Sequence, residues 1–167
     1  MCGLVGYFGL KGEAPPLAAM LESLAHRGPD ASGQARFTGG AMASTRLAMV
    51  GPRDGDQPRV AASGSVLSLN GQIYDWRDVA KGVATDSDTA ALHVGLERDG
   101  ASIVGSLRGP FAFAWARANG EGLVLARDAF GQRPLYHARL GGGIVFASEL
   151  RALRAAGIPL ELEACLL

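Results

Sequence analysis

The segment Phe111-Ala-Phe-Ala-Trp-Ala116 constrains the fold most strongly, because large aromatic residues alternate in it with alanine. Side chains of a strand point alternately to its two faces, so one face carries the aromatic rings and the other only alanines. The aromatic face needs a thick apolar layer, whereas the alanine face lets another layer approach closely. The pattern therefore predicts a strand that lies between two layers of one domain.

Glycine makes up 24 of the 167 residues, about twice the usual share, without the period of collagen or the low hydrophobicity of disorder. Gly3, Gly6 and Gly9 interrupt an apolar run, which predicts a buried strand with a neighbouring layer packed close to it. Alternation and turn residues predict further strands within 39–51, 65–71, 123–127, 134–138 and 144–147.

Helical spacing and capping residues predict the remaining elements. A helix is expected over 17–24, a weaker one over 74–80, one from the N-cap Ser87 to Arg98, and a short one at 103–107. Ser148 is expected to cap a last helix that ends at Gly157. Two groups of strands among helices indicate an α+β domain with stacked sheets. We expect this domain to span residues 1–157, with 158–167 as a C-terminal tail or the start of a linker.

Charge and cysteine usage exclude several classes of function. Sixteen Lys and Arg balance sixteen Asp and Glu, so neither nucleic acid nor an anionic membrane is expected as a partner. No apolar run is long enough to predict a membrane span. Cys2 and Cys165 stand at opposite ends and form no disulfide framework, which favours a reducing, cytoplasmic location. No metal-ligand spacing occurs, so no metal site is expected and the three histidines are interpreted as structural.

Cys2 is the first candidate for chemistry, because it becomes the N-terminal residue when Met1 is removed. A free α-amine has a pKa near 8, so it can accept the proton of the thiol without a separate histidine. One residue would then supply both nucleophile and base. The alternative is that Cys2 is only a small apolar residue at the edge of a buried strand.

Eight short motifs occur in a characteristic order along the chain. They are MCGLVGYFG, HRGPD (26–30), TRLAMV (45–50), NGQIY (70–74), SDT (87–89), FAFAW (111–115), ARDAFGQRPLYH (126–137) and FASELRAL (146–153). Together they resemble the glutaminase domain of the class II glutamine amidotransferases. Within that group, the chain is most similar to the N-terminal half of glutamine-dependent asparagine synthetases.

The resemblance implies a fold and a mechanism. The fold would be the four-layer αββα sandwich of N-terminal nucleophile hydrolases, and the substrate would be L-glutamine. Cys2 would attack the side-chain amide, while the Asn70 side chain and the Gly71 backbone N–H would stabilise the oxyanion. Taken alone, Asn70-Gly71 is a strong turn signal, so a purely structural role stays open.

The resemblance also implies a clamp for the free amino acid. Arg46 would bind the α-carboxylate and Asp88 the α-ammonium, although each alone is typical of a surface charge. The other residues that the resemblance places at the pocket are Leu47, Met49, Val50 and Gln72. The residues that it places in the supporting structure are His26, Arg27, Asp30, Arg127 and Asp128.

The sequence departs from the family pattern at two pocket positions. Gln72 stands where the family usually has a glutamate, and Ser44 stands where it usually has a histidine. No SGG-type phosphate loop of a synthetase half occurs either. We therefore expect no cofactor on this chain, with ATP and magnesium only on a synthetase partner, and oligomers are possible. The sequence would be either an excised domain or a free-standing glutaminase.

These departures leave other functions open. One alternative is a catalytically weakened, glutaminase-like module that binds or regulates a separate synthetase. Another is a class II transferase with a different acceptor, or the partner of a small peptide-maturation cyclase. Hydrolysis of glutamine to supply ammonia to an asparagine-synthetase-like ligase remains the main hypothesis.

Overall fold

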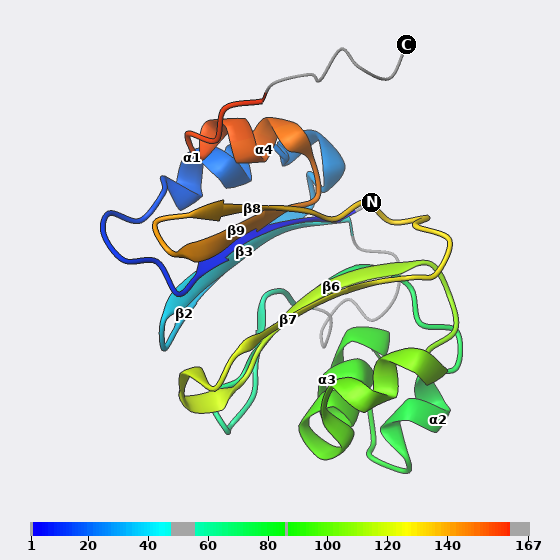
Figure 1. Cartoon of the computed structure of the whole chain (residues 1–167). Helices are drawn as coiled ribbons and strands as arrows, with labels where there is room; N and C mark the ends of the chain where they lie inside the picture. Colours follow the sequence, from blue (N-terminus) through cyan, green and yellow to red (C-terminus); the bar gives the residue numbers. More distant parts are fainter. Residues whose placement is uncertain (1, 48–55, 86, 161–167) are drawn as a thin grey trace.

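Two antiparallel sheets face each other and carry helices on their outer faces (Figure 1). The computed structural model describes residues 2–47, 56–85 and 87–160. In spatial order, the first sheet contains β2 (Ala31–Phe37), β3 (Gly40–Arg46), β1 (Gly3–Phe8), β9 (Gly143–Ala147) and β8 (Tyr136–Leu140). The second contains β4 (Arg59–Val60), β5 (Val66–Gly71), β6 (Phe111–Ala116) and β7 (Leu123–Arg127).

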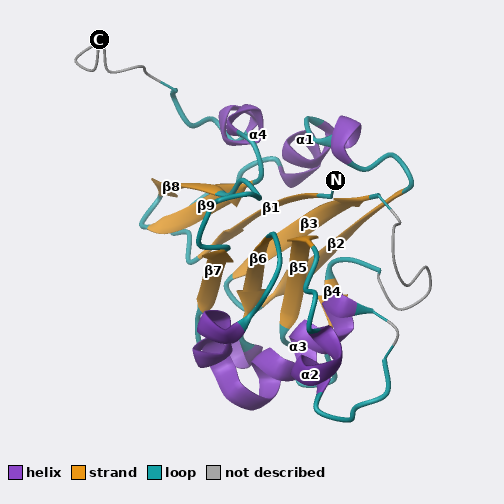
Figure 2. Cartoon of the chain, turned by 90° about the vertical axis from the view of Figure 1, so that its right-hand side faces the viewer, coloured by secondary structure: helices purple, strands orange, loops and turns teal. Residues whose placement is uncertain are grey.

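The helices complete the four layers (Figure 2). The first sheet is covered by α1 (Leu17–Glu22) and α4 (Leu150–Ala155), and the second by α2 (Trp76–Ala80) and α3 (Asp88–Asp99). Short 3₁₀ segments are η1 (Ala25–Arg27), η2 (Gly100–Ser106) and η3 (Ala118–Gly120). The predicted α+β, four-layer αββα architecture is therefore confirmed. In the part of the chain that the structure describes, no helix is long and apolar enough to cross a membrane.

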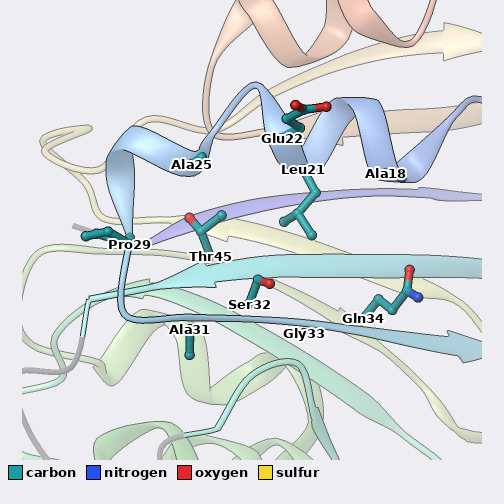
Figure 3. Close-up of a pocket in the computed structure, with 11 residues that line it drawn as sticks. Ala18, Leu21, Glu22, Ala25, Pro29, Ala31, Ser32, Gly33, Gln34 and Thr45 are labelled. Atoms are coloured by element: carbon teal, nitrogen blue, oxygen red, sulfur yellow. The ribbon is translucent and has the colours of Figure 1, made fainter.

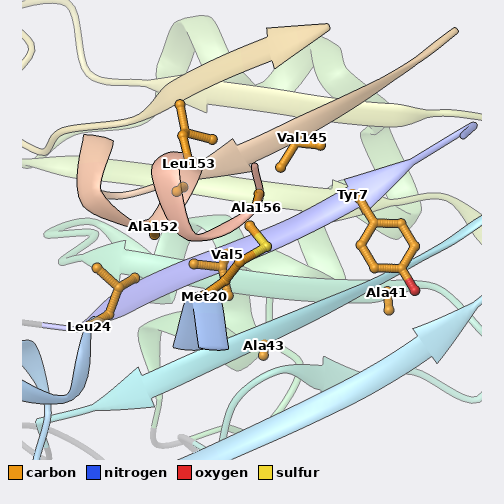
Figure 4. Packing of buried hydrophobic residues seen from close by; sticks show 11 residues of the cluster. Val5, Tyr7, Met20, Leu24, Ala41, Ala43, Val145, Ala152, Leu153 and Ala156 are labelled. Atoms are coloured by element: carbon orange, nitrogen blue, oxygen red, sulfur yellow. The ribbon is translucent and has the colours of Figure 1, made fainter. Parts of the chain in front are cut away.

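The core consists of three apolar clusters, one for each interface between layers. The outer cluster of the first sheet joins α1 and α4 to β1, through residues such as Met20, Leu153 and Val5 (Figure 4). On the other side of the molecule, Leu92 and Leu96 of α3 pack on the second sheet. The inter-sheet cluster contains Leu4, Met42, Val66, Ala114, Ala116 and Phe146. All of these side chains are buried.

β6 divides its side chains between two of these clusters as its sequence predicts. Phe111, Phe113 and Trp115 pack toward α3, whereas Ala114 and Ala116 pack between the sheets. On the alanine face, Ala114 and Ala116 pack with Leu4 of β1, Met42 of β3 and Phe146 of β9. The alternation thus decides the orientation of the strand between the two layers.

Two predictions about local structure need correction. β2 was not predicted, because most of its side chains are exposed or half-buried on an edge strand, so no apolar alternation marks it. Ser148 does not cap α4. Its Oγ accepts a hydrogen bond from the Leu4 backbone N–H at 3.0 Å, and the N-cap position is occupied by Glu149. The predicted N-cap Ser87 is confirmed, since its Oγ accepts from the Ala90 N–H.

Asp128 holds the connection between β7 and β8, in agreement with its predicted structural role. Its carboxylate accepts hydrogen bonds from the backbone N–H groups of Phe111, Phe130, Gln132 and Arg133, at 3.0–3.3 Å. Burial opposes ionisation of Asp128, but these four donors outweigh it and lower its pKa. The turn is therefore fixed by a carboxylate that stays charged.

His93 of α3 is expected to make the stability of the fold depend on pH. It is buried, its Nε2 lies 2.6 Å from the Ser65 Oγ, and burial lowers its pKa to about 4. The neighbouring Glu97 raises this pKa and Arg59 lowers it, but burial is the largest cause. Because the unfolded chain binds this proton near pH 6.5, the histidine favours the native state above that pH. We expect about 3 kcal/mol of stability to be lost between pH 6.5 and 4.

Denaturant unfolding measured at intervals between pH 7.5 and 4 checks this expectation. The His93→Gln variant is the control, since glutamine retains polar groups near Ser65 without titrating. An equally steep loss of stability in this variant would show that other groups cause the acid sensitivity.

Candidate active site

Three strands bring Cys2, Arg46 and Asn70 to one end of the space between the sheets. Gly3 pairs with Thr45 in the antiparallel β1–β3 ladder, so Cys2 lies beside Arg46. Leu4, Met42 and Val66 face the inter-sheet space, and strand alternation therefore places Cys2, Arg46 and Asn70 on the same inner faces.

A hydrogen bond between the sheets supports this placement. The Ser44 and Ser68 hydroxyl groups lie 2.8 Å apart and are buried. Each precedes a predicted site residue by two positions, since Arg46 follows Ser44 and Asn70 follows Ser68 on the same face. The site thus occupies the end of the sandwich next to this bond. Ser44, where the resemblance implies a histidine, thus links β3 to β5.

Cys2 is half-buried and held through its backbone. Its Sγ is 3.9 Å from the Leu47 carbonyl oxygen, and its own carbonyl accepts a hydrogen bond from Arg27 Nε at 3.1 Å. Arg27 Nη1 in turn donates to Glu149 Oε1 at 2.7 Å. Burial opposes ionisation of Glu149, but hydrogen bonds from Arg27 and His26 lower its pKa. These groups fix the backbone that carries the thiol.

Arg27 therefore has a supporting role, as its sequence interpretation predicts, and it holds the backbone of Cys2 directly. Glu149 was not predicted at all. Their relation is visible in the sequence only as two separate motifs, HRGPD and FASELRAL, whose charged residues are more than 120 positions apart. Nothing local in either motif indicates that they pair.

Asn70 and Gly71 lie within β5 and not in a turn. They pair with Ala112 and Phe111 of β6. Asn70 is 1% exposed, and neither its amide oxygen nor its amide nitrogen has a hydrogen-bond partner among the described residues. An unpaired buried amide costs stability, which makes Asn70 a candidate for a binding or catalytic role.

The backbone at Gly71 requires glycine. Its φ is +140°, and an added Cβ would collide with the Pro110 carbonyl oxygen and lie 2.7 Å from the Phe111 Cα. The next residue, Gln72, donates its N–H to the Pro110 oxygen at 2.9 Å. β5 therefore ends in a conformation that a larger residue at position 71 would disturb.

Arg46 and Asp88 are buried and not ordinary surface charges. Arg46 Nη1 lies 2.8 Å from Oδ1 of Asp56, whose side chain is 84% exposed. Asp88 Oδ2 accepts a hydrogen bond from the Ile73 N–H at 3.0 Å. Burial raises the pKa of Asp88, although hydrogen bonds from the Ile73 and Thr89 backbones partly oppose this. A cation next to Asp88 would favour its charged form.

The other predicted pocket residues differ in how close they lie to Cys2 and in whether the structure describes them. Leu47 contributes the carbonyl oxygen beside the Cys2 thiol. Gln72 is exposed next to Ile73, whose N–H binds Asp88. Met49 and Val50 lie outside the described residues. The structure therefore brings Cys2, Arg46 and Leu47 together, and it places Asn70 at the same end of the inter-sheet space.

A cavity of about 290 Å³ lies at Arg46 and is lined by residues 31–34, Asp56, Gln57 and Pro58. A larger cavity of about 580 Å³ lies between α1 and β2 (Figure 3). Thr45 lines this larger cavity and alternates with Arg46 along β3, so the cavity is on the opposite face of the sheet. It is therefore separate from the candidate site.

Among the described residues, no group of three or more His, Cys, Asp or Glu side chains is arranged to hold a metal ion.

Comparison with known proteins decides the family. The family model described as the glutamine amidotransferase domain matches residues 1–165. The chain belongs to this family. Its curated relatives include asparagine synthetase [glutamine-hydrolyzing] 3 of Arabidopsis thaliana, 32% identical over 164 aligned positions in a match that covers 92% of this chain and 28% of the relative. Asparagine synthetase [glutamine-hydrolyzing] 1 of Bacillus subtilis is 31% identical over 177 residues, covering 98% and 28%.

The fold of this glutamine amidotransferase domain is also found in solved structures. Glutamine phosphoribosylpyrophosphate amidotransferase from B. subtilis, complexed with ADP and GMP, superposes with a TM-score of 0.76 at 24% identity. The match covers 93% of this chain and 44% of that one. The superposition agrees with the four-layer αββα fold that the motifs imply. The chain spans just over a quarter of the length of the curated relatives named above.

Proposed function

We propose that this domain hydrolyses L-glutamine to glutamate and ammonia, with Cys2 as the nucleophile. The observation that carries the proposal is the convergence of three strand ends. Cys2 lies beside the buried Arg46, and the buried amide of Asn70, which has no hydrogen-bond partner among the described residues, lies at the same end of the sandwich. A thiol, a cation for a carboxylate and a free amide donor are the groups that this reaction needs.

The proposed reaction proceeds through a thioester. After removal of Met1, the α-amine of Cys2 takes the thiol proton while the sulfur attacks the amide carbon of glutamine. Asn70 Nδ2 and the Gly71 N–H donate to the resulting oxyanion. The amine then passes the proton to the leaving nitrogen, and ammonia departs. Water attacks the thioester, which releases glutamate and restores the thiol.

The substrate is a zwitterion, and the proposed clamp matches both of its charges. Arg46 would bind the α-carboxylate and Asp88 the α-ammonium. Burial raises the pKa of Asp88, and an ammonium group beside it would favour its charged form. Gln72 would accept one further hydrogen bond in place of the family's glutamate. Backbone groups of Leu47, Met49 and Val50 would complete the pocket.

The proposed acceptor of the ammonia is an asparagine-synthetase-like ligase on another domain or chain. The names of the curated relatives support this class of partner. Activation of the acceptor would require ATP and magnesium on that partner, because the reaction proposed for this domain uses neither. The cytoplasmic location of this domain stays a prediction.

A non-catalytic module that regulates a synthetase is the alternative. Two observations favour it: Gln72 lacks the carboxylate of the family pattern, and Arg46 is already paired with Asp56. In this case the pocket would bind glutamine weakly and without turnover.

Wild-type protein lacking Met1 is expected to release glutamate and ammonia from L-glutamine in a 1:1 ratio, and to leave D-glutamine unchanged. Coupled assays for the two products measure the ratio, and mass spectrometry confirms the N-terminus. Heat of glutamine binding without product would reject the hydrolase and support the regulatory module.

A further inference from the structure

Asp56 supplies a carboxylate to the arginine that the proposed function reserves for the substrate. Its Oδ1 is 2.8 Å from Arg46 Nη1, and both residues line the 290 Å³ cavity at the end of β3. The Arg46 side chain is 9% exposed and that of Asp56 is 84% exposed. An arginine that lies mostly inside the protein is therefore reached by a carboxylate that lies mostly outside it.

The chain around Asp56 is fixed by its neighbour. Gln57 Oε1 accepts a hydrogen bond from the Leu69 N–H of β5 at 2.6 Å, and Gln57 Nε2 donates to Thr89 Oγ1 at 3.4 Å. An added Cβ at Gly33 of β2 would collide with the Gln57 carbonyl oxygen. Contacts with β2, β5 and α3 therefore position Gln57, the residue that follows Asp56. The Asp56–Arg46 pair thus lies next to a residue that the fold holds in place.

The same segment reaches the second half of the proposed clamp. Thr89, which receives the Gln57 bond, directly follows Asp88, and its Oγ1 is 3.5 Å from Asp88 Oδ1. Asp56 and Gln57 thus connect the cation for the α-carboxylate with the carboxylate for the α-ammonium.

We propose that Asp56 is an internal competitor for Arg46 that sets the apparent affinity of the site for glutamine. This inference rests on the proposed function. The α-carboxylate and the Asp56 carboxylate carry the same charge and seek the same guanidinium, so the substrate must displace Asp56 or share Arg46 with it. Asp56 does not touch the reacting amide. It therefore raises the KM and leaves kcat unchanged.

The competition is modest in size, because one partner is solvated. An ion pair with an exposed carboxylate contributes little, so removal of the Asp56 charge should lower the KM by about 3- to 10-fold. Asp56→Asn keeps the shape and removes the charge, whereas Asp56→Ala removes the side chain. Asp78→Asn on α2 removes the same charge from another exposed position and is the matched control.

Steady-state glutamate release is measured for wild type and for the three variants, and L-glutamate is titrated calorimetrically into each. A 3- to 10-fold lower KM in both Asp56 variants, with kcat unchanged and Asp78→Asn like wild type, supports the inference. An unchanged or higher KM overturns it while the proposed hydrolase stands.

Absence of turnover in the wild type rejects the proposed hydrolase but still tests Asp56 through the titration. Tighter binding of L-glutamate to Asp56→Asn than to wild type then supports competition for Arg46. Equal binding, or no binding to either protein, overturns it.

Discussion

Replacement of Cys2 by alanine is expected to reduce glutamine hydrolysis by about 10⁴-fold or more, because the proposed reaction has no second nucleophile. The glutamate formed per minute measures the effect. Cys2 is half-buried and its Sγ makes one weak contact, with the Leu47 oxygen at 3.9 Å. The variant should therefore unfold within about 1 kcal/mol of the wild type and still bind glutamine.

A second change separates the thiol from the amine. Protein that retains Met1 keeps the thiol but has a peptide nitrogen in place of the α-amine of Cys2. It should be nearly as inactive as Cys2→Ala, and removal of Met1 with an aminopeptidase should restore activity. Full activity with Met1 present would reject the amine as the base, and activity that survives Cys2→Ala would reject the nucleophile.

Replacement of Asn70 by alanine is expected to lower kcat by about 10²- to 10³-fold, the usual effect of removing one oxyanion donor. Stability should move in the opposite direction or not at all, because the Asn70 amide is buried without a partner among the described residues. The paired measurement of kcat and denaturant midpoint therefore distinguishes a catalytic amide from a structural one.

Ser68→Ala is the matched control, since Ser68 lies two residues earlier on the same face of β5. It loses the hydrogen bond to Ser44 and should cost about 1 kcal/mol of stability with little change in kcat. If Asn70→Ala instead destabilised the protein and left kcat intact, Asn70 would be a structural residue.

The architecture was predictable from local patterns of sequence. The alternation in β6, the glycines of β1 and the N-cap of α3 each indicate the local structure of their own segment. Together they predict a layered α+β fold. β2 was missed because an edge strand with no buried face has no apolar period. Ser148 was misassigned because its hydroxyl binds Leu4, and a bond between residues 144 positions apart leaves no local signal.

The residues of the candidate site could be predicted only where a motif contains them. The resemblance indicated Cys2, Arg46, Asn70 and Asp88, and the structure places Arg46, Asn70 and Asp88 at buried positions and Cys2 at a half-buried one. It did not indicate the pairs Arg27–Glu149 and Arg46–Asp56, because such pairs depend on how strands and loops meet in three dimensions. Burial of Arg46 and Asp88 likewise followed from packing, since charge alone favours the surface.

The alanine face of β6 in the core bears on the distance between Asn70 and Cys2. Ala112 pairs with Asn70, and Ala112, Ala114 and Ala116 are fully buried. The methyl groups of Ala114 and Ala116 in the inter-sheet cluster help to set how far the sheet that carries Asn70 stands from the sheet that carries Cys2. A displacement of about 1 Å between reacting groups can cost about 10²-fold in rate. Alanines that take no part in the proposed reaction would thus help to fix the distance between the two residues on which it depends.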